Sequence, residues 1–129
     1  MNPPTDAPAI RVTAMPENLN PYGDIFGGWL MSQMALAAGS LASRHSRGKA
    51  VVVAASDLQF PGAMEVGDEL SVYAGLERQG RSSMLIRVRA VARERDGEKE
   101  QQVASGEFTF VALDGDDKPR AISQESPNG

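Results

Sequence analysis

The sequence predicts an α+β fold in which one long helix is wrapped by a curved antiparallel sheet of about five strands. Two observations carry this prediction. The 19 residues of Ile25–Ser43 contain no charged side chain, as in a buried helix. The segments after it alternate apolar and polar residues and are joined by short glycine-containing turns. Strands joined by short turns pair antiparallel, so they can form one sheet against the helix.

The elements before and within the helix follow from local residue types. A short strand is expected at Ile10–Met15, and the Pro-, Asn- and Gly-rich passage Pro16–Asp24 cannot form regular structure. We expect the helix from about Phe26 to about Ser43, ended by Gly48 and followed closely by basic residues that suit a helix C-terminus. Because no face of this helix is charged, we expect it to be buried all round.

Four strands are expected after the helix, at Ala50–Phe60, Asp68–Arg78, Ser82–Arg95 and Gln102–Leu113. In the third of these, apolar residues such as Met84 and Ile86 face one way, and a row of arginines faces the other. We expect the arginine row to be a solvated sheet face paired with acids on a neighbouring strand. One uncharged helix wrapped by such a sheet is the hot-dog arrangement. It predicts a single domain over 9–122, with loose tails at 1–8 and 123–129, and self-association through a sheet edge or the helix.

Composition excludes several classes of function. The chain has 129 residues, a net charge of −4 and no dominant basic stripe, so we expect no nucleic-acid partner. It has no cysteine, which excludes disulfides and thiolate chemistry and fits a cytoplasmic protein. One histidine, His45, excludes a multi-histidine metal site. We expect neither a signal peptide at Met1–Pro8 nor a membrane span at Ile25–Ser43, because glycines, serines and Gln33 interrupt the latter.

Two adjacent glycines at the start of the helix are the most informative feature. Gly27 and Gly28 each cost about 1 kcal/mol relative to alanine inside a helix. One compensation is close approach of a ligand to the backbone N–H groups that the first helical turn leaves unpaired. These groups lie at the positive end of the helix dipole and suit a developing oxyanion. The alternative is that the glycines only permit tight packing. Likewise, Asp24 is either a catalytic carboxylate or a helix N-cap, and Asn20 is by default a turn residue.

The block Asn20–Met34, which contains Gly-Asp-Ile-Phe-Gly-Gly-Trp, closely resembles the signature of YciA-type acyl-CoA thioesterases of the hot-dog superfamily. Weaker matches follow in the same order, at Gly80–Met84, Phe108–Ala112 and Pro119-Arg120. The resemblance implies hydrolysis of an acyl-CoA to a free acid and CoA, without a metal or redox cofactor. It also implies a backbone N–H of Gly27 or Gly28 on the thioester carbonyl, and subunits paired as dimers and trimers of dimers.

The phosphates of coenzyme A need basic residues near the entrance of the site. The resemblance makes Arg81, with Ser82 and Ser83, the first candidate group and the basic residues after the helix, Arg44, Arg47 and Lys49, the second. Each group also has an ordinary explanation, as a solvated turn or as a complement to the helix dipole. Trp29, Met31 and Met34 are expected to line the core or the acyl channel.

One departure from the family pattern concerns catalysis directly. The family carries an aspartate seven residues past the second glycine, which acts as base or nucleophile, and here that position is Ala35. Three explanations stand: a laboratory substitution, a natural relative in which Asp24 or Asp57 activates water, or a natural acyl-CoA binder without turnover. Ser56-Asp57 also shifts an acid by one position, and adjacent strand residues face opposite ways. A hydratase is disfavoured by the position of His45, and a purely structural domain leaves the glycine pair without a role.

Overall fold

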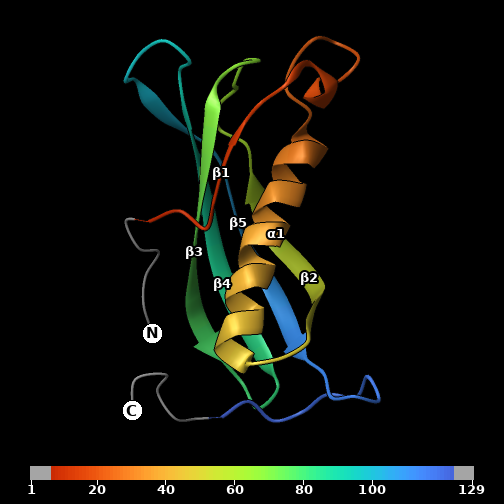
Figure 1. Cartoon of the computed structure of the whole chain (residues 1–129). Helices are drawn as coiled ribbons and strands as arrows, with labels where there is room; N and C mark the ends of the chain where they lie inside the picture. The colour runs from red at the N-terminus through yellow and green to blue at the C-terminus, as the bar shows by residue number, and fades with distance from the viewer. Residues whose placement is uncertain (1–6, 124–129) are drawn as a thin grey trace.

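The computed structural model describes residues 7–123, and within them one long helix crosses one face of a five-stranded antiparallel sheet (Figure 1). The strand order is β1-β3-β4-β5-β2, and every neighbouring pair is antiparallel. The expected α+β architecture is therefore confirmed. The loose tails expected at 1–8 and 123–129 lie almost wholly outside the described residues.

The helix α1 spans Gly27–Ser46, so it ends later than the sequence predicted. The predicted ending is otherwise confirmed, because Arg44 and His45 lie in the last turn and Gly48 follows directly after the C-cap. The left-handed residue is Arg47, with φ 61°. The expectation of burial all round is wrong for the single chain. One face is buried, through Leu30, Met34, Ala37, Ala38, Ala42 and Ser46, whereas Met31 is 38% exposed and Leu36 is 61% exposed.

The core lies between α1 and the inner face of the sheet. The strands are β1 (Ile10–Thr13), β2 (Ala50–Gln59), β3 (Glu69–Gln79), β4 (Ser83–Arg93) and β5 (Glu100–Ala112). Inward residues alternate along β4 as predicted, and Met84, Ile86, Val88 and Ala90 are fully buried. This apolar layer packs against the buried face of α1. Burial of apolar surface of this kind is the main favourable contribution to folding.

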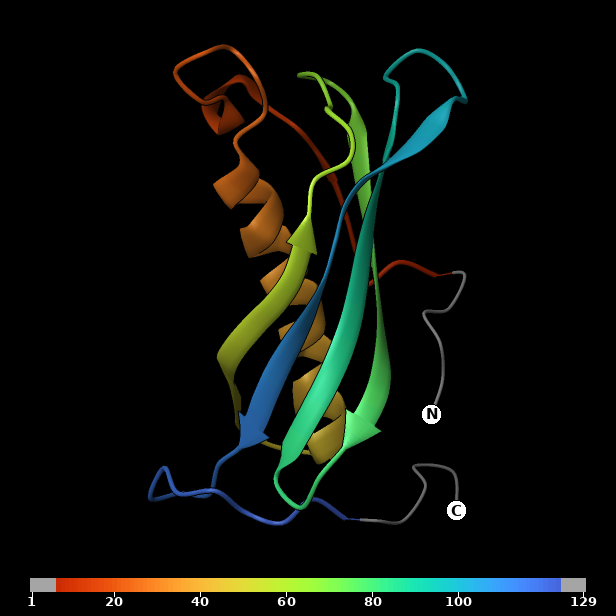
Figure 2. The same cartoon turned by 180° about the vertical axis from the view of Figure 1, so that it is seen from behind.

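The outer face of the sheet carries paired charges, as predicted for the arginine row (Figure 2 shows this side of the sheet). Arg87 on β4 bonds to Glu77 on β3 at 2.5 Å and to Glu107 on β5 at 2.6 Å. The hydrogen bond from Arg87 lowers the pKa of Glu77, and Glu77 in turn raises the pKa of Arg87. Arg89 lies over the Tyr73 ring, 4.3 Å from its centroid. This face therefore satisfies its own charges.

The strand β2 forms a long, apolar edge of the sheet. It pairs with β5 on one side, and its other side has no strand partner among residues 7–123. Its side chains are mostly exposed, and Val52 and Val53 are 48% and 57% exposed. From Ala50 to Ser56 this exposed edge carries no charge, and Asp57 is the one charged side chain of β2. An exposed stretch of this kind invites pairing with another chain.

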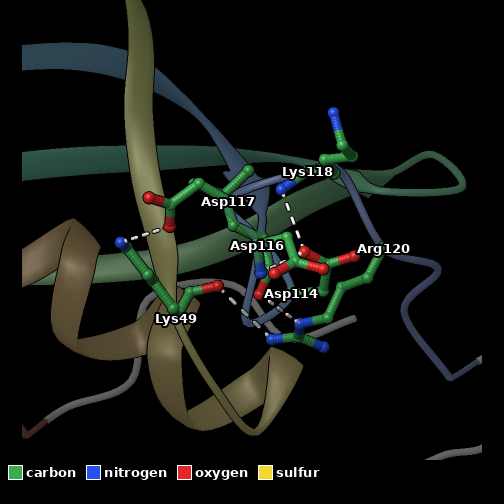
Figure 3. Close-up of polar contacts among 7 residues, drawn as sticks. Lys49, Asp114, Asp116, Asp117, Lys118 and Arg120 are labelled. Atoms are coloured by element: carbon green, nitrogen blue, oxygen red, sulfur yellow. Dashed lines mark hydrogen bonds and ion pairs between the residues drawn. The ribbon is translucent and has the colours of Figure 1, made fainter.

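The C-terminal loop fastens the far end of the helix to the sheet (Figure 3). The Arg120 guanidinium donates from Nη1 to Ser46 O at 2.9 Å and from Nε to Leu113 O at 2.9 Å. It thereby satisfies a carbonyl at the C-terminus of α1, which has no helical partner. In the same loop, hydrogen bonds from the backbone N–H groups of Lys118 and Asp116 lower the pKa of Asp114.

Arg120→Ala is expected to lower the free energy of unfolding by about 1–3 kcal/mol, because it leaves partly buried carbonyls without a charged donor. Arg120→Lys is expected to recover only part of this loss, since an ammonium cannot reproduce the planar fork of a guanidinium. Urea denaturation measures both. Lys118→Ala, at an exposed side chain of the same loop, is the matched control. Equal midpoints for Arg120→Ala and the unaltered protein would contradict this role.

Candidate active site

The passage before the helix is folded back on itself and fixes the helix start. Leu19 and Ile25 form an isolated antiparallel bridge, and Phe26 N donates to Asn18 O at 2.7 Å. Inside this loop, Asn20 Oδ1 accepts hydrogen bonds from the backbone N–H groups of Tyr22 and Asp24, at 2.8 and 3.0 Å. Asn20 therefore organises the turn, as its residue type alone suggests.

The helix begins without a side-chain cap. Its N-cap residue is Phe26, in an extended conformation with φ −67° and ψ 127°, and no side chain accepts from the first turn. The N-cap interpretation of Asp24 is therefore wrong. Asp24 is exposed beside the loop, and only its backbone takes part in hydrogen bonds within the described chain.

Two backbone N–H groups at this helix start have no acceptor within residues 7–123. Trp29 N and Leu30 N both donate to Phe26 O, at 3.0 and 3.2 Å, whereas the amides of Gly27 and Gly28 have no partner. Both glycines are only half-buried. Two adjacent free donors at the positive end of a 20-residue helix form a site for a carbonyl oxygen or an anion.

The two glycines have different surroundings. A Cβ at Gly28 would lie 2.5 Å from Cε2 of the Phe26 ring, whereas a Cβ at Gly27 would meet no atom within 4 Å beyond its chain neighbours and the backbone of α1. The Phe26 ring, itself 52% exposed, therefore covers Gly28. The sequence indicated the glycine pair but gave no sign that the preceding phenylalanine folds over it.

Ala35 lies two helical turns beyond Gly28 and so on the same side of α1. It is half-buried and packs against the core. No carboxylate occurs in α1, because the helix sequence Gly27–Ser46 contains neither aspartate nor glutamate. The start of α1 therefore presents two free amide donors with no acid or base of the helix beside them.

Asp57, the other candidate carboxylate, is exposed on the edge strand β2. It stands in a bulge of β2 with φ 52°, and its Oδ1 accepts from Gln59 Nε2 at 3.1 Å. Glu77 is the main cause of the raised pKa of Arg87, and Glu107 and then Asp57 add smaller effects. The charge of Asp57 therefore lies close enough to the outer face to act on Arg87. Asp24 is thus the nearest carboxylate in sequence to the free amides.

The residues predicted to bind the phosphates of coenzyme A lie at the other end of the molecule. Arg81 and Ser82 stand in the turn between β3 and β4, and Arg47 and Lys49 follow the end of α1. His45 Nε2 lies 2.6 Å from Gln79 Oε1, which joins the helix end to this turn. The structure therefore brings the two basic groups near each other. The glycine pair is about 30 Å away along α1, at 1.5 Å per residue.

Two of these predicted residues already have local roles. Lys49 Nζ bonds to Asp117 Oδ1 at 2.6 Å (Figure 3). Ser83 is one of the residues that line a small surface pocket of about 150 Å³, together with Arg78, Gln79, Gly80, Leu85 and Thr109. Arg81 is exposed, and its carbonyl accepts from Ile122 N at 2.7 Å. Its guanidinium forms no hydrogen bond or ion pair with another described residue.

The described residues contain no group of three or more His, Asp or Glu side chains arranged to hold a metal ion. None of the helices they form combines the length and apolar character needed to cross a membrane.

Comparisons with known proteins give one consistent family. The model of the thioesterase superfamily matches residues 22–99. An uncharacterized acyl-CoA thioester hydrolase of Zymomonas mobilis is 48% identical over 116 residues, which cover 90% of this chain and 78% of the relative. The acyl-CoA thioester hydrolase YciA of Escherichia coli is 37% identical over 128 residues. This match covers 96% of this chain and 96% of the relative.

A solved structure gives the same result for the fold. A hexameric broad-specificity acyl-coenzyme A thioesterase, in its aspartate-to-alanine mutant form, superposes with a TM-score of 0.89. It is 35% identical, and the match covers 95% of this chain and 90% of that one. The likeness therefore extends over nearly the whole chain.

Proposed function

Since the chain belongs to the thioesterase superfamily, we propose that it hydrolyses acyl-CoA thioesters at the start of α1. The observation that carries this proposal is the pair of unpaired amides at Gly27 and Gly28. The relatives over most of the chain are acyl-CoA thioester hydrolases. The reaction class follows from the family, and the position of the site follows from the free donors.

In the proposed reaction, the thioester carbonyl oxygen accepts hydrogen bonds from the two glycine amides. Water adds to the carbonyl carbon, the C–S bond breaks, and the thiol of CoA leaves with the proton that water gives up. The amides stabilise the negative charge that develops on the oxygen, an effect worth about 2.7–4 kcal/mol per donor in other enzymes. The reaction needs no metal or redox cofactor. Because α1 has no carboxylate, we expect water to be activated weakly and turnover to be slow.

A thiol-release assay on acyl-CoAs of short to long chain tests this function directly. Hydrolysis is supported if one thiol is released per acyl group and if the release requires the folded protein. No release with any chain length, together with no binding of any acyl-CoA in calorimetry, would overturn the proposal.

We further propose that subunits pair through the β2 edge and that the pairs assemble into hexamers. The exposed valines of β2 and the uncharged exposed face of α1 support this, as does the hexameric state of the solved relative. A second subunit is also a way to bring the predicted phosphate-binding groups at Arg81 and Lys49 near the glycine pair, because within one chain these groups lie at the far end of α1. The active site in this proposal is therefore shared between subunits.

Val53→Lys is expected to convert the assembly to monomers, since it puts a charge on the free edge of β2. Val53 is 57% exposed in the single chain, so the lysine does not disturb the core. Size-exclusion chromatography with light scattering measures the mass. Val66→Lys, at a 41% exposed valine in the loop before β3, is the control. An unchanged mass for Val53→Lys would remove the β2 edge from the interface.

The second candidate function is an acyl-CoA-binding protein without turnover, and Ala35 is the observation that favours it. Calorimetry and thiol release on the same preparation separate the two. Tight binding with no release above the uncatalysed rate identifies a binder. The absence of cysteine supports a cytoplasmic location for either function.

A further inference from the structure

The edge strand β2 contains an extra residue that changes which way its next side chain points. Ser56 lies opposite Glu107 and Gln59 lies opposite Ser105, so three steps along β2 match two along β5. Asp57 takes up the extra residue in a left-handed conformation. A bulge of this kind interrupts the alternation of side chains between the two faces. Leu58 consequently points inward and packs against the core.

Leu58 occupies space that a glycine on β5 leaves free. Gly106 lies between the inward residues Ala104 and Phe108, and a Cβ there would be 2.5 Å from Leu58 Cδ2. The same Cβ would be 3.5 Å from Met34 Cε on α1. Leu58, Gly106 and Met34 therefore meet at one point between the edge strand and the helix. Any larger residue at position 106 would compete with Leu58 for this volume.

This point lies along the path expected for the acyl chain. Met34 is six residues past Gly28, which is about 9 Å along the helix axis. A chain whose carbonyl is held at the glycine amides and which runs beside α1 reaches this level after a few methylenes. Met34 is fully buried, whereas Leu58 is half-buried at the border of the core. Leu58 is thus the member of the group whose side chain is partly accessible from outside the core.

We propose that Leu58, seated over Gly106, sets the length of the acyl chain that the site accepts. This inference rests on the proposed function. A short acyl group ends before Leu58, and a longer one has to displace its side chain. Gly106 acts by giving Leu58 room to lie flat against β5. The bulge at Asp57 is the structural cause, because it turns Leu58 towards α1.

The proposal predicts opposite effects for two alanine substitutions. Leu58→Ala empties the space that the Leu58 side chain fills, so longer acyl chains are expected to be preferred. The ratio of kcat/KM for a long acyl-CoA to that for a short one is expected to rise roughly tenfold. Gly106→Ala pushes the flexible end of Leu58 towards α1 and is expected to shift the preference to shorter chains. In the double variant the added methyl fills part of the emptied space, so the profile returns towards that of the unaltered protein.

The experiment measures Kd by calorimetry and thiol release for acyl-CoAs from acetyl to palmitoyl, with the full chain in its native assembly. Leu85→Ala is the matched control, because Leu85 is also half-buried but lies on the outer side of β4. Circular dichroism verifies folding, and Leu58→Val repeats the test in a smaller step if Leu58→Ala does not fold.

Unchanged chain-length profiles in folded Leu58→Ala and Gly106→Ala, or shifts of both in the same direction, would overturn this inference and leave the proposed function intact. A protein that neither binds nor hydrolyses any acyl-CoA would instead refute the proposed function, and the inference with it.

Discussion

Ala35→Asp is expected to raise the rate of thiol release from acyl-CoA by about 10²–10⁴, the range for a positioned general base. The alanine lies two turns past Gly28 on the same side of α1. Because the two positions are about 10 Å apart along the helix axis, we expect the carboxylate to take a proton from water in a site shared with the paired subunit proposed above. Ala35 is only half-buried, so an ionised side chain can keep contact with solvent. The comparison is made on the same acyl-CoA panel as for the unaltered protein.

Ala35→Asn is the control, because it has nearly the same shape as aspartate but no basic carboxylate. Its rate is expected to stay near that of the unaltered protein. If the unaltered protein already turns over rapidly and Ala35→Asp adds little, Ala35 does not mark a lost base. Asp24→Asn would then be the next variant, because Asp24 is the carboxylate nearest in sequence to the free amides.

Gly27→Pro is expected to lower the rate by about 10²–10³, the loss seen when one oxyanion donor is removed. Proline removes the Gly27 N–H and nothing else that the helix needs, since the first helical position tolerates proline. Phe26 already has the extended conformation that a residue before proline requires, with φ −67° and ψ 127°. Apart from its two chain neighbours and the backbone of α1, no atom lies within 4 Å of a Cβ at this position, so residues elsewhere in the fold do not obstruct the ring.

Gly27→Ala separates the lost donor from the added carbon, since alanine keeps the N–H. We expect it to retain most of the activity of the unaltered protein. Both variants are best measured in the Ala35→Asp background as well, where the rate is higher. Equal rates for Gly27→Pro and Gly27→Ala, with helix content preserved, would show that this amide does not bind the transition state.

The features that the sequence predicted best depend on patterns several residues long. The alternation at Met84–Ala92 predicted which side chains enter the core, because a strand has a fixed period of two. The arginine row was expected to pair with acids, and Arg87 does so on both sides. The glycine pair was placed at the helix start, where its amides are in fact free.

The features that the sequence did not predict depend on single backbone torsions or on tertiary packing. The helix ends at Ser46 and not near Ser43, and the residue that closes it in the left-handed conformation is Arg47, although this conformation is uncommon for a residue with a Cβ. The bulge at Asp57 follows from pairing with β5, and no local signal marks it. The glycine pair and Arg81 both belong to blocks that match the family pattern, so the sequence did not show that they lie far apart. That distance depends on the topology of the fold.

The exposed edge of β2 has a consequence for how the protein behaves on dilution. If association covers this edge, folding and assembly are linked by mass action, and the apparent stability rises with protein concentration. An enzyme assay at nanomolar concentration then samples more separated chains than a crystal or a calorimeter does. The specific activity per chain is consequently expected to fall as the protein is diluted, even though each chain keeps its own fold.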